Sequence, residues 1–148
     1  MKFFIIKYKD NLESFWLQKL LYIPEEHSFF MENIVRDVEI ELVLKTISLG
    51  ICNNMVVNVS GFCGLNSFMK SNFQVPKYQK GILNVVHNLK FGYAYGIYNY
   101  DLPVHVNHIT GWICIGDPYL KGSAVEFIQN CVAIIDINNM LLSLWLRP

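Results

Sequence analysis

The chain has 148 residues, of which 53% are hydrophobic and 16% are charged, and its formal net charge is zero. This balance excludes intrinsic disorder, which requires low hydrophobicity and high net charge, and it predicts a single globular domain over residues 1–148. The net charge argues against a nucleic-acid partner, and no run reaches the roughly 18 apolar residues of a membrane span. The apolar run at the N-terminus stops at Lys7, which is too early for a signal peptide. We therefore expect a cytoplasmic protein with no membrane partner.

Charge is unevenly distributed along the sequence. Residues 1–41 hold eight acidic and five basic side chains, whereas residues 42–148 hold four acidic and seven basic ones. The most acidic window is "ENIVRDVEIE", residues 32–41. An acidic face there would complement a basic partner, and an ordinary solvated surface explains the same pattern.

Three segments are predicted before residue 48. Residues 2–9 form a β-prone run, and residues 11–23 place apolar side chains near helical spacing before Pro24, which predicts a helix. Residues 36–47 alternate, which predicts a strand with one solvated face, and their Glu and Leu content leaves a helix as the alternative. The two sides of this strand are Val38, Ile40, Leu42 and Leu44 against Asp37, Glu39, Glu41 and Lys45.

The middle of the chain reads as strands and loop. Residues 55–62 are predicted as a strand and residues 63–80 as a loop rich in Gly, Asn, Ser and Pro. Residues 81–101 are rich in β-branched and aromatic side chains. They predict two strands, or one long strand kinked at Gly92 or Gly96.

The C-terminal third predicts a sheet most clearly. The run 106–118 ends in Gly-Asp-Pro, a turn signal, and residues 124–135 and 140–146 are apolar runs joined by "DINN", which predicts a hairpin. We therefore expect an α+β fold, a mostly antiparallel β-sheet with one or two helices packed on it.

His105, His108 and Cys114 are the side chains that could build a chemical site in the run "HITGWICIGDP" and just before it. A zinc site lacks its second ligand pair, and positions 105 and 108 of one strand point to opposite faces. A hydrolase or nuclease using His105 and His108 remains an alternative, although no Lys or Arg lies between residues 90 and 121. Alternation pairs Trp112 with Cys114 and Ile113 with Ile115, which predicts a central strand with two apolar faces. We expect no catalytic residue, metal or cofactor.

Two further features leave alternatives open. Reduced cysteines are the default in a cytoplasmic chain, and a disulfide between Cys52 and Cys63 is the alternative. The aromatic run Phe91, Tyr93, Tyr95, Tyr98 and Tyr100 is explained by core packing, by a Tyr-rich recognition surface, or by the lining of a small-ligand pocket.

The stretches "GWICIGDP" (111–118), "AVEFIQNCVAIID" (124–136) and "LLSLWLRP" (141–148) resemble the C-terminal part of immunity proteins of bacterial contact-dependent growth inhibition and polymorphic-toxin systems. This resemblance implies a non-enzymatic protein that forms a one-to-one complex with a cognate toxin domain, such as a nuclease, and blocks its active site. Cationic toxins would favour an acidic face with aromatic anchors. The expected toxin-binding residues are Glu32, Asp37, Glu39, Glu41, Tyr93, Tyr95 and Tyr98.

Overall fold

The computed structural model describes residues 1–8, 18–32, 37–63, 69–70, 72–98 and 101–148, and these residues form strands and turns without a helix. The protein is therefore all-β in its described part, and the expected α+β class is wrong. The strands are β1 (Lys2–Lys7), β2 (Leu20–Ile23), β3 (Ser28–Met31), β4 (Ile40–Leu44), β5 (Ile47–Cys52), β6 (Met55–Phe62), β7 (Met69–Lys70), β8 (Gln79–Val86), β9 (Ala94–Gly96), β10 (Val104–Val106), β11 (Ile113–Gly116), β12 (Ser123–Ile128), β13 (Cys131–Ile135) and β14 (Leu141–Leu146).

The predicted helix over 11–23 fails where the structure describes it. Residues 18 and 19 are not helical and Leu20–Ile23 is strand β2, while residues 11–17 lie outside the described residues. β2 pairs antiparallel with β3 through a tight turn in which His27 has a φ of 51°. The cross-strand hydrogen bonds of this hairpin replace the helical ones, so tertiary pairing overrides the local spacing. No helix that could cross a membrane occurs in the described part of the chain.

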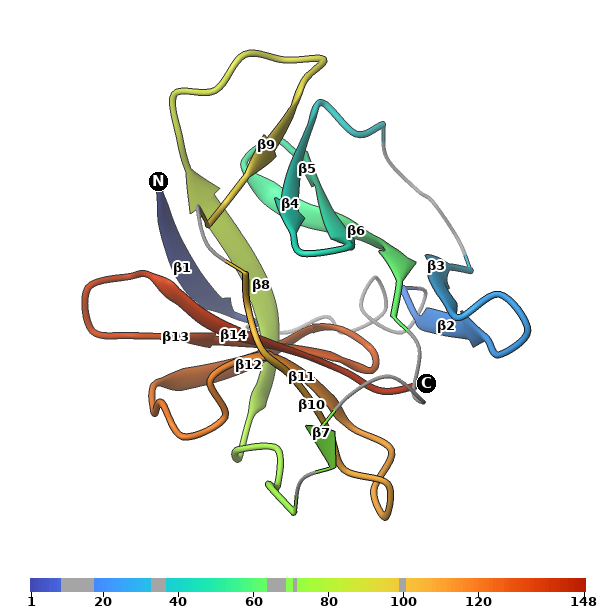
Figure 1. Ribbon diagram of the computed structural model, residues 1–148. Coiled ribbons are helices and arrows are strands. Elements are labelled where there is room, and N and C mark those ends of the chain that lie inside the picture. The colour runs from blue at the N-terminus through green and yellow to red at the C-terminus, as the bar shows by residue number, and fades with distance from the viewer. Residues whose placement is uncertain (9–17, 33–36, 64–68, 71, 99–100) are drawn as a thin grey trace.

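All the strands belong to one curled sheet with the order β7-β10-β11-β14-β13-β12-β8-β6-β5-β4-β9, and β1, β2 and β3 branch from this path. In Figure 1 one half of the sheet, with β4, β5 and β9, lies at the top, and the other half, with β7 and β10 to β12, lies at the bottom. We call the lower half the C-terminal half, because all its strands except β7 come from the last third of the chain. Strand β8 joins them, because Gln79 and Lys80 pair with β12 while Asn84 pairs with Met55 of β6. The rest of β8 pairs antiparallel with β1.

The main core lies between the two halves of the curled sheet. In β4, Ile40, Leu42 and Leu44 are buried, whereas Glu41 and Val43 are half-buried. This alternation confirms a strand with the predicted apolar side over Ile40–Leu44. The strand is shorter than the predicted 36–47, because residues 45 and 46 form a turn and Ile47 begins β5. Side chains from β5, β6, β11, β13 and β14 also belong to this cluster, so the two halves share one core.

The C-terminal half is apolar on both faces. Ile113 and Ile115 of β11 belong to the main core, and Trp112 and Cys114 belong to a second cluster on the opposite face. This arrangement confirms the predicted central strand. Side chains of neighbouring strands form one row across that second face: His105, Cys114, Trp145, Val132 and Glu126.

A short segment covers this second cluster. Residues 72–78, which we call the strap, cross the outer face of the C-terminal half and pack Phe73 and Val75 against it. Asn107 fixes the strap by donating from its Nδ2 to the carbonyl oxygen of Phe73 at 2.9 Å. The sequence predicted this stretch only as loop.

Most of the remaining strand predictions are confirmed, and one apolar run contains two strands. Strand 55–62 and the hairpin around residues 136–139 are confirmed, and 81–101 contains two separate strands, β8 and β9. The run 124–135 is not one strand, because a tight turn with Asn130 at a φ of 72° splits it into β12 and β13. Asn tolerates this left-handed conformation better than most residues.

The four cysteines are free and buried. Cys52 lies opposite Met55 at the turn of the β5–β6 hairpin, and Cys63 follows the far end of β6. Eight residues of strand separate the two ends by about 25 Å, whereas a disulfide requires Cα atoms within about 7 Å. The Cys52–Cys63 disulfide is therefore absent from this fold.

Candidate functional site

Pairing of β4 with β9 brings the acidic and aromatic segments of the sequence together. The two strands are parallel, with Glu41 opposite Ala94 and Val43 opposite Gly96. The backbone N–H of Glu41 donates to the carbonyl oxygen of Tyr93 at 3.1 Å. A contact between residues about fifty positions apart thus places Glu41 of β4, and Glu39 just before it, beside the aromatic run.

An open hollow marks this junction. Residues 38–41 and 92–94 line it, and its volume is about 280 Å³. Tyr93 is 62% exposed at its wall, and Phe91, just before it in sequence, is 66% exposed. Glu41 lies half-buried in the same lining. Together these groups present carboxylates and accessible rings on one surface, which we call the β4–β9 face.

Glu39 has a structural task on this face. Its Oε2 accepts a hydrogen bond from the backbone N–H of Asn53 at 3.2 Å, and its Oε1 lies 3.9 Å from the Cys52 thiol. Asn53 and Asn54 form the β5–β6 turn with φ values of 50° and 60°. The carboxylate therefore holds this turn at the side of the hollow.

Tyr95 and Tyr98 are half-buried, in contrast to the exposed Phe91 and Tyr93. Both pack against the main core. The Tyr95 hydroxyl accepts from the backbone N–H of Lys90 at 3.1 Å and so closes the loop before β9. The Tyr98 hydroxyl donates to the carbonyl oxygen of Leu141 at the start of β14. These two side chains stabilise the fold around the β4–β9 face.

The acidic window 32–41 does not form one face. Asp37 is exposed directly before the hollow, but Glu32 follows β3. The order β4-β5-β6-β3 places Glu32 three strands from β4, roughly 14 Å at the usual strand spacing. Four of the seven expected interface residues therefore gather at the β4–β9 face, namely Asp37, Glu39, Glu41 and Tyr93.

Phe91 joins this face although it was not among the expected interface residues. The Phe91–Gly92 pair forms a turn, with Gly92 at a φ of 87°, and the ring projects into solvent. Gly92 was the signal in the sequence that could have identified Phe91 as exposed. A glycine favours a turn, and a turn at this point takes Phe91 out of the strand that contains Tyr95.

The two histidines have different environments, but not because they alternate within one strand: β10 ends at Val106 and His108 lies beyond it. His105 is half-buried in β10 with its ring centroid 5.8 Å from that of Phe73, and His108 is exposed in the following turn. His108 lines a hollow of about 230 Å³ with Lys70, Asn72 and Ile109, and His105 is not part of its lining. The β7–β10 pairing thus supplies a lysine that the local sequence lacks.

Cys114 is unsuited to act as a nucleophile. Burial raises the pKa of its thiol to about 12, against a hydrogen bond with Ser143 that lowers it. A nucleophilic cysteine needs a lowered pKa and access to solvent. Cys114 therefore contributes to packing in the second cluster.

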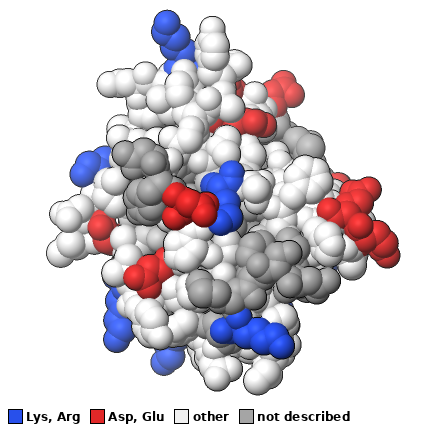
Figure 2. Space-filling model, viewed as in Figure 1, with Lys and Arg blue, Asp and Glu red and all other residues white. Residues whose placement is uncertain are grey.

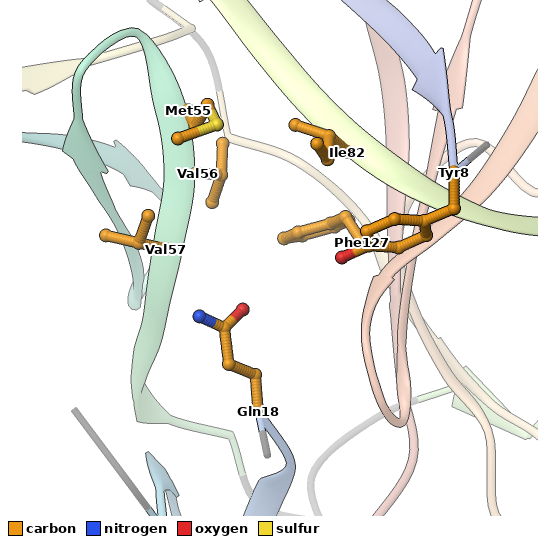
Figure 3. A pocket seen from close by; sticks show the side chains of 7 residues that line it. All are labelled: Tyr8, Gln18, Met55, Val56, Val57, Ile82 and Phe127. Atoms are coloured by element: carbon orange, nitrogen blue, oxygen red, sulfur yellow. The ribbon is translucent and has the colours of Figure 1, made fainter. Parts of the chain in front are cut away.

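One pocket lies between β6, β8 and β12 (Figure 3). Met55 and Val57 face Tyr8, Ile82 and Phe127 across it, and its volume is about 70 Å³. Pockets for small ligands usually measure about 300–1,000 Å³. The lining of this pocket contains no member of the aromatic run 91–100.

Comparison with known protein-family models and with curated proteins finds no match to the chain.

Proposed function

We propose that the protein is an immunity protein that binds a cognate toxin domain one-to-one in the cytoplasm and blocks its active site through the β4–β9 face. The observation that carries this proposal is the juxtaposition of the carboxylates of Glu39 and Glu41, at and just before β4, with the exposed rings of Phe91 and Tyr93. The C-terminal sequence resemblance supports it.

Exposed aromatic rings suit a protein interface. Tyrosine is enriched among the few residues that dominate binding energy, and aromatic residues are enriched at interfaces generally. Phe91 and Tyr93 are each more than 60% exposed in the free chain, so most of their area is available for burial by a partner. The hollow beside Tyr93 accepts a projecting side chain of that partner.

Charge indicates a cationic partner. Asp37, Glu39 and Glu41 lie at or beside the hollow, whose lining contains no basic residue; Lys90, directly before Phe91, leaves an excess of acidic side chains. A surface with excess negative charge accelerates association with a positive partner and disfavours wrong partners. A toxin that acts on nucleic acid carries such positive charge around its active site.

Edge strand β9 offers backbone groups as well. It ends the strand order, and its residues Ala94 and Gly96 are exposed. Tyr93 and Ile97 hydrogen-bond to β4, so the backbone groups of the alternate residues Ala94 and Gly96 point away from it. An extended segment of the partner could pair there.

The test uses the toxin domain encoded immediately upstream, with its activity and its Kd for the full chain measured together. Tyr93→Ala is expected to weaken binding by at least about 30-fold, the effect of a hot spot worth about 2 kcal/mol. Phe62→Ala is the matched control, because Phe62 is 63% exposed at the far end of β6. A wild-type chain that leaves the toxin fully active at equimolar ratio would overturn the proposal.

A second pair of variants, each of which removes one negative charge, tests the electrostatic argument. Glu41→Gln is expected to slow association at low salt, and Glu32→Gln, which lies three strands away, is expected to have a smaller effect. Equal effects of the two substitutions would show that net charge, and not the β4–β9 face, attracts the partner.

A further inference from the structure

Basic side chains gather at the end of the molecule opposite the β4–β9 face. Five of the seven basic residues after position 41 lie on or beside the strap: Lys70, Lys77, Lys80, Lys121 and Arg147. In Figure 2 the lower end of the molecule, where β7 and the strap lie in Figure 1, shows Lys and Arg side chains, and the carboxylates of this view lie above it. Basic side chains also lie elsewhere in this view, but the lower end carries them without a carboxylate beside them on the face that is shown.

The two carboxylates closest to this region are engaged within the protein. The Oδ1 atom of Asp117 accepts from the backbone N–H of Tyr119 at 2.8 Å. Glu126 is 8% exposed, and its Oε2 accepts from the backbone N–H of Asn130 at 3.2 Å. Burial of Glu126 raises its pKa. The five basic residues on or beside the strap outnumber these two carboxylates, so the charge there is positive on balance.

Aromatic rings lie among these bases in two groups. Tyr119 is 72% exposed and meets Phe73 of the strap edge-on, with ring centroids 4.3 Å apart. Tyr78, at the other end of the strap, is 41% exposed, and its ring centroid lies 6.4 Å from that of Trp112. The guanidinium carbon of Arg147 lies 6.0 Å from the centroid of the Trp112 ring.

The hollow at His108 continues this surface. Lys70, Asn72 and His108 line it, and Asn72 precedes Phe73 in the strap. Asn107 links the parts, because its Nδ2 donates to the carbonyl oxygen of Phe73 and its backbone N–H donates to the carbonyl oxygen of Trp112, both at 2.9 Å. We call the surface made by these basic residues, the two groups of rings and the hollow the strap face.

We propose that the strap face binds single-stranded nucleic acid, with phosphates on Lys70, Lys77, Lys121 and Arg147 and bases stacked on Tyr119 and Tyr78. Proteins that bind single strands combine a positive surface with accessible aromatic rings. Single strands expose base faces for stacking, whereas a duplex hides them. This property is separate from toxin binding, because its residues lie in the other half of the sheet. It differs from the expectation of no nucleic-acid partner, which rested on the net charge alone.

The test measures fluorescence anisotropy of a labelled twelve-residue oligouridylate with the full chain. Binding is expected to weaken with salt, with a slope of about −0.7 in log K per contacted phosphate. Tyr119→Ala is expected to weaken binding at least about fivefold, and Tyr119→Phe, which keeps the ring, is expected to bind within about twofold. Phe62→Ala is the control for loss of an exposed ring elsewhere, since Phe62 is 63% exposed.

The charge variants carry their own control. Lys77→Gln combined with Lys121→Gln is expected to weaken binding and to reduce the salt slope, whereas Lys2→Gln combined with Lys90→Gln, which removes the same charge elsewhere, is expected to leave the slope unchanged. A labelled oligothymidylate of equal length distinguishes RNA from DNA as the preferred strand, and binding of either supports the proposal.

Three results would overturn the proposal. The first is that the chain does not bind the oligonucleotide at low salt. The second is that the two pairs of lysine substitutions weaken binding equally. The third is that the chain binds heparin as tightly as the oligonucleotide and that Tyr119→Ala does not change oligonucleotide binding. Toxin inhibition is expected to survive Tyr119→Ala, and oligonucleotide binding is expected to survive Tyr93→Ala. The two proposals therefore fail independently.

Discussion

Replacing Gly116 with alanine tests how β11 is held at its C-terminal end. Gly116 closes β11 with a φ of 117°, and a Cβ atom built there would lie 2.6 Å from the carbonyl oxygen of Leu142 and 3.0 Å from the Cα of Ser143. Both atoms belong to the backbone of the neighbouring strand β14, so neither can rotate away. Gly111, before the same strand, has a φ of 83° and no atom within 4 Å of its Cβ position.

The two glycines separate backbone strain from steric clash. A positive φ costs an alanine about 1–2 kcal/mol at either position. The clash adds about 1–3 kcal/mol at Gly116 alone, the usual cost of overpacking. We therefore expect Gly116→Ala to lower the free energy of unfolding by about 2–5 kcal/mol and Gly111→Ala by about 1–2 kcal/mol.

Urea unfolding followed by tryptophan fluorescence measures both variants. At about 2.1 cal/mol/K per residue, the unfolding entropy of this chain is about 0.3 kcal/mol/K, so the extra loss for Gly116→Ala corresponds to a Tm lower by about 3–10 °C. Equal destabilisation of the two variants would refute the reasoning, because it would show that the β11–β14 contact relaxes freely around an added methyl group.

Three other outcomes follow from buried polar groups. Tyr98→Phe removes the hydroxyl that donates to Leu141, and we expect a loss of about 1 kcal/mol in urea unfolding. Burial raises the pKa of Glu126, so the stability that this group contributes is complete near pH 4 and is lost as pH rises through the raised pKa. Glu126→Gln keeps an acceptor for Asn130, and we expect this variant to be more stable than the wild type at pH 8 but not at pH 4. A variant that is less stable than the wild type at pH 8 would contradict burial as the cause of the raised pKa. With a pKa of about 12, the Cys114 thiol is about 10⁻⁴ ionised at pH 8, so Ellman's reagent should label it only after unfolding.

Local patterns determined the parts of the fold that depend on neighbours in sequence. The apolar side of β4, the two apolar faces of β11 and the turn at residues 136–139 all follow from alternation and turn chemistry within about ten residues. The side of a strand that is buried is set by its own period of two, so the sequence alone predicts it.

The helix expected over 11–23 shows where local spacing is insufficient. Residues 20–23 become a strand because β3 supplies hydrogen-bond partners. Likewise, the spacing of Tyr93, Tyr95 and Tyr98 does not reveal that Tyr95 and Tyr98 pack against the core while Tyr93 is exposed. The position of β9 beside β4 decides this, and those strands are about fifty residues apart.

Both candidate surfaces were decided by tertiary structure. The parallel β4–β9 pairing creates the acidic and aromatic face, and the crossing of the strap over the second cluster gathers the bases beside Tyr119 and Tyr78. Sequence determined which side chains are charged or aromatic and which strand faces are buried. Only long-range strand pairing decided which of those side chains meet, because the energy of such contacts depends on partners that no local pattern identifies.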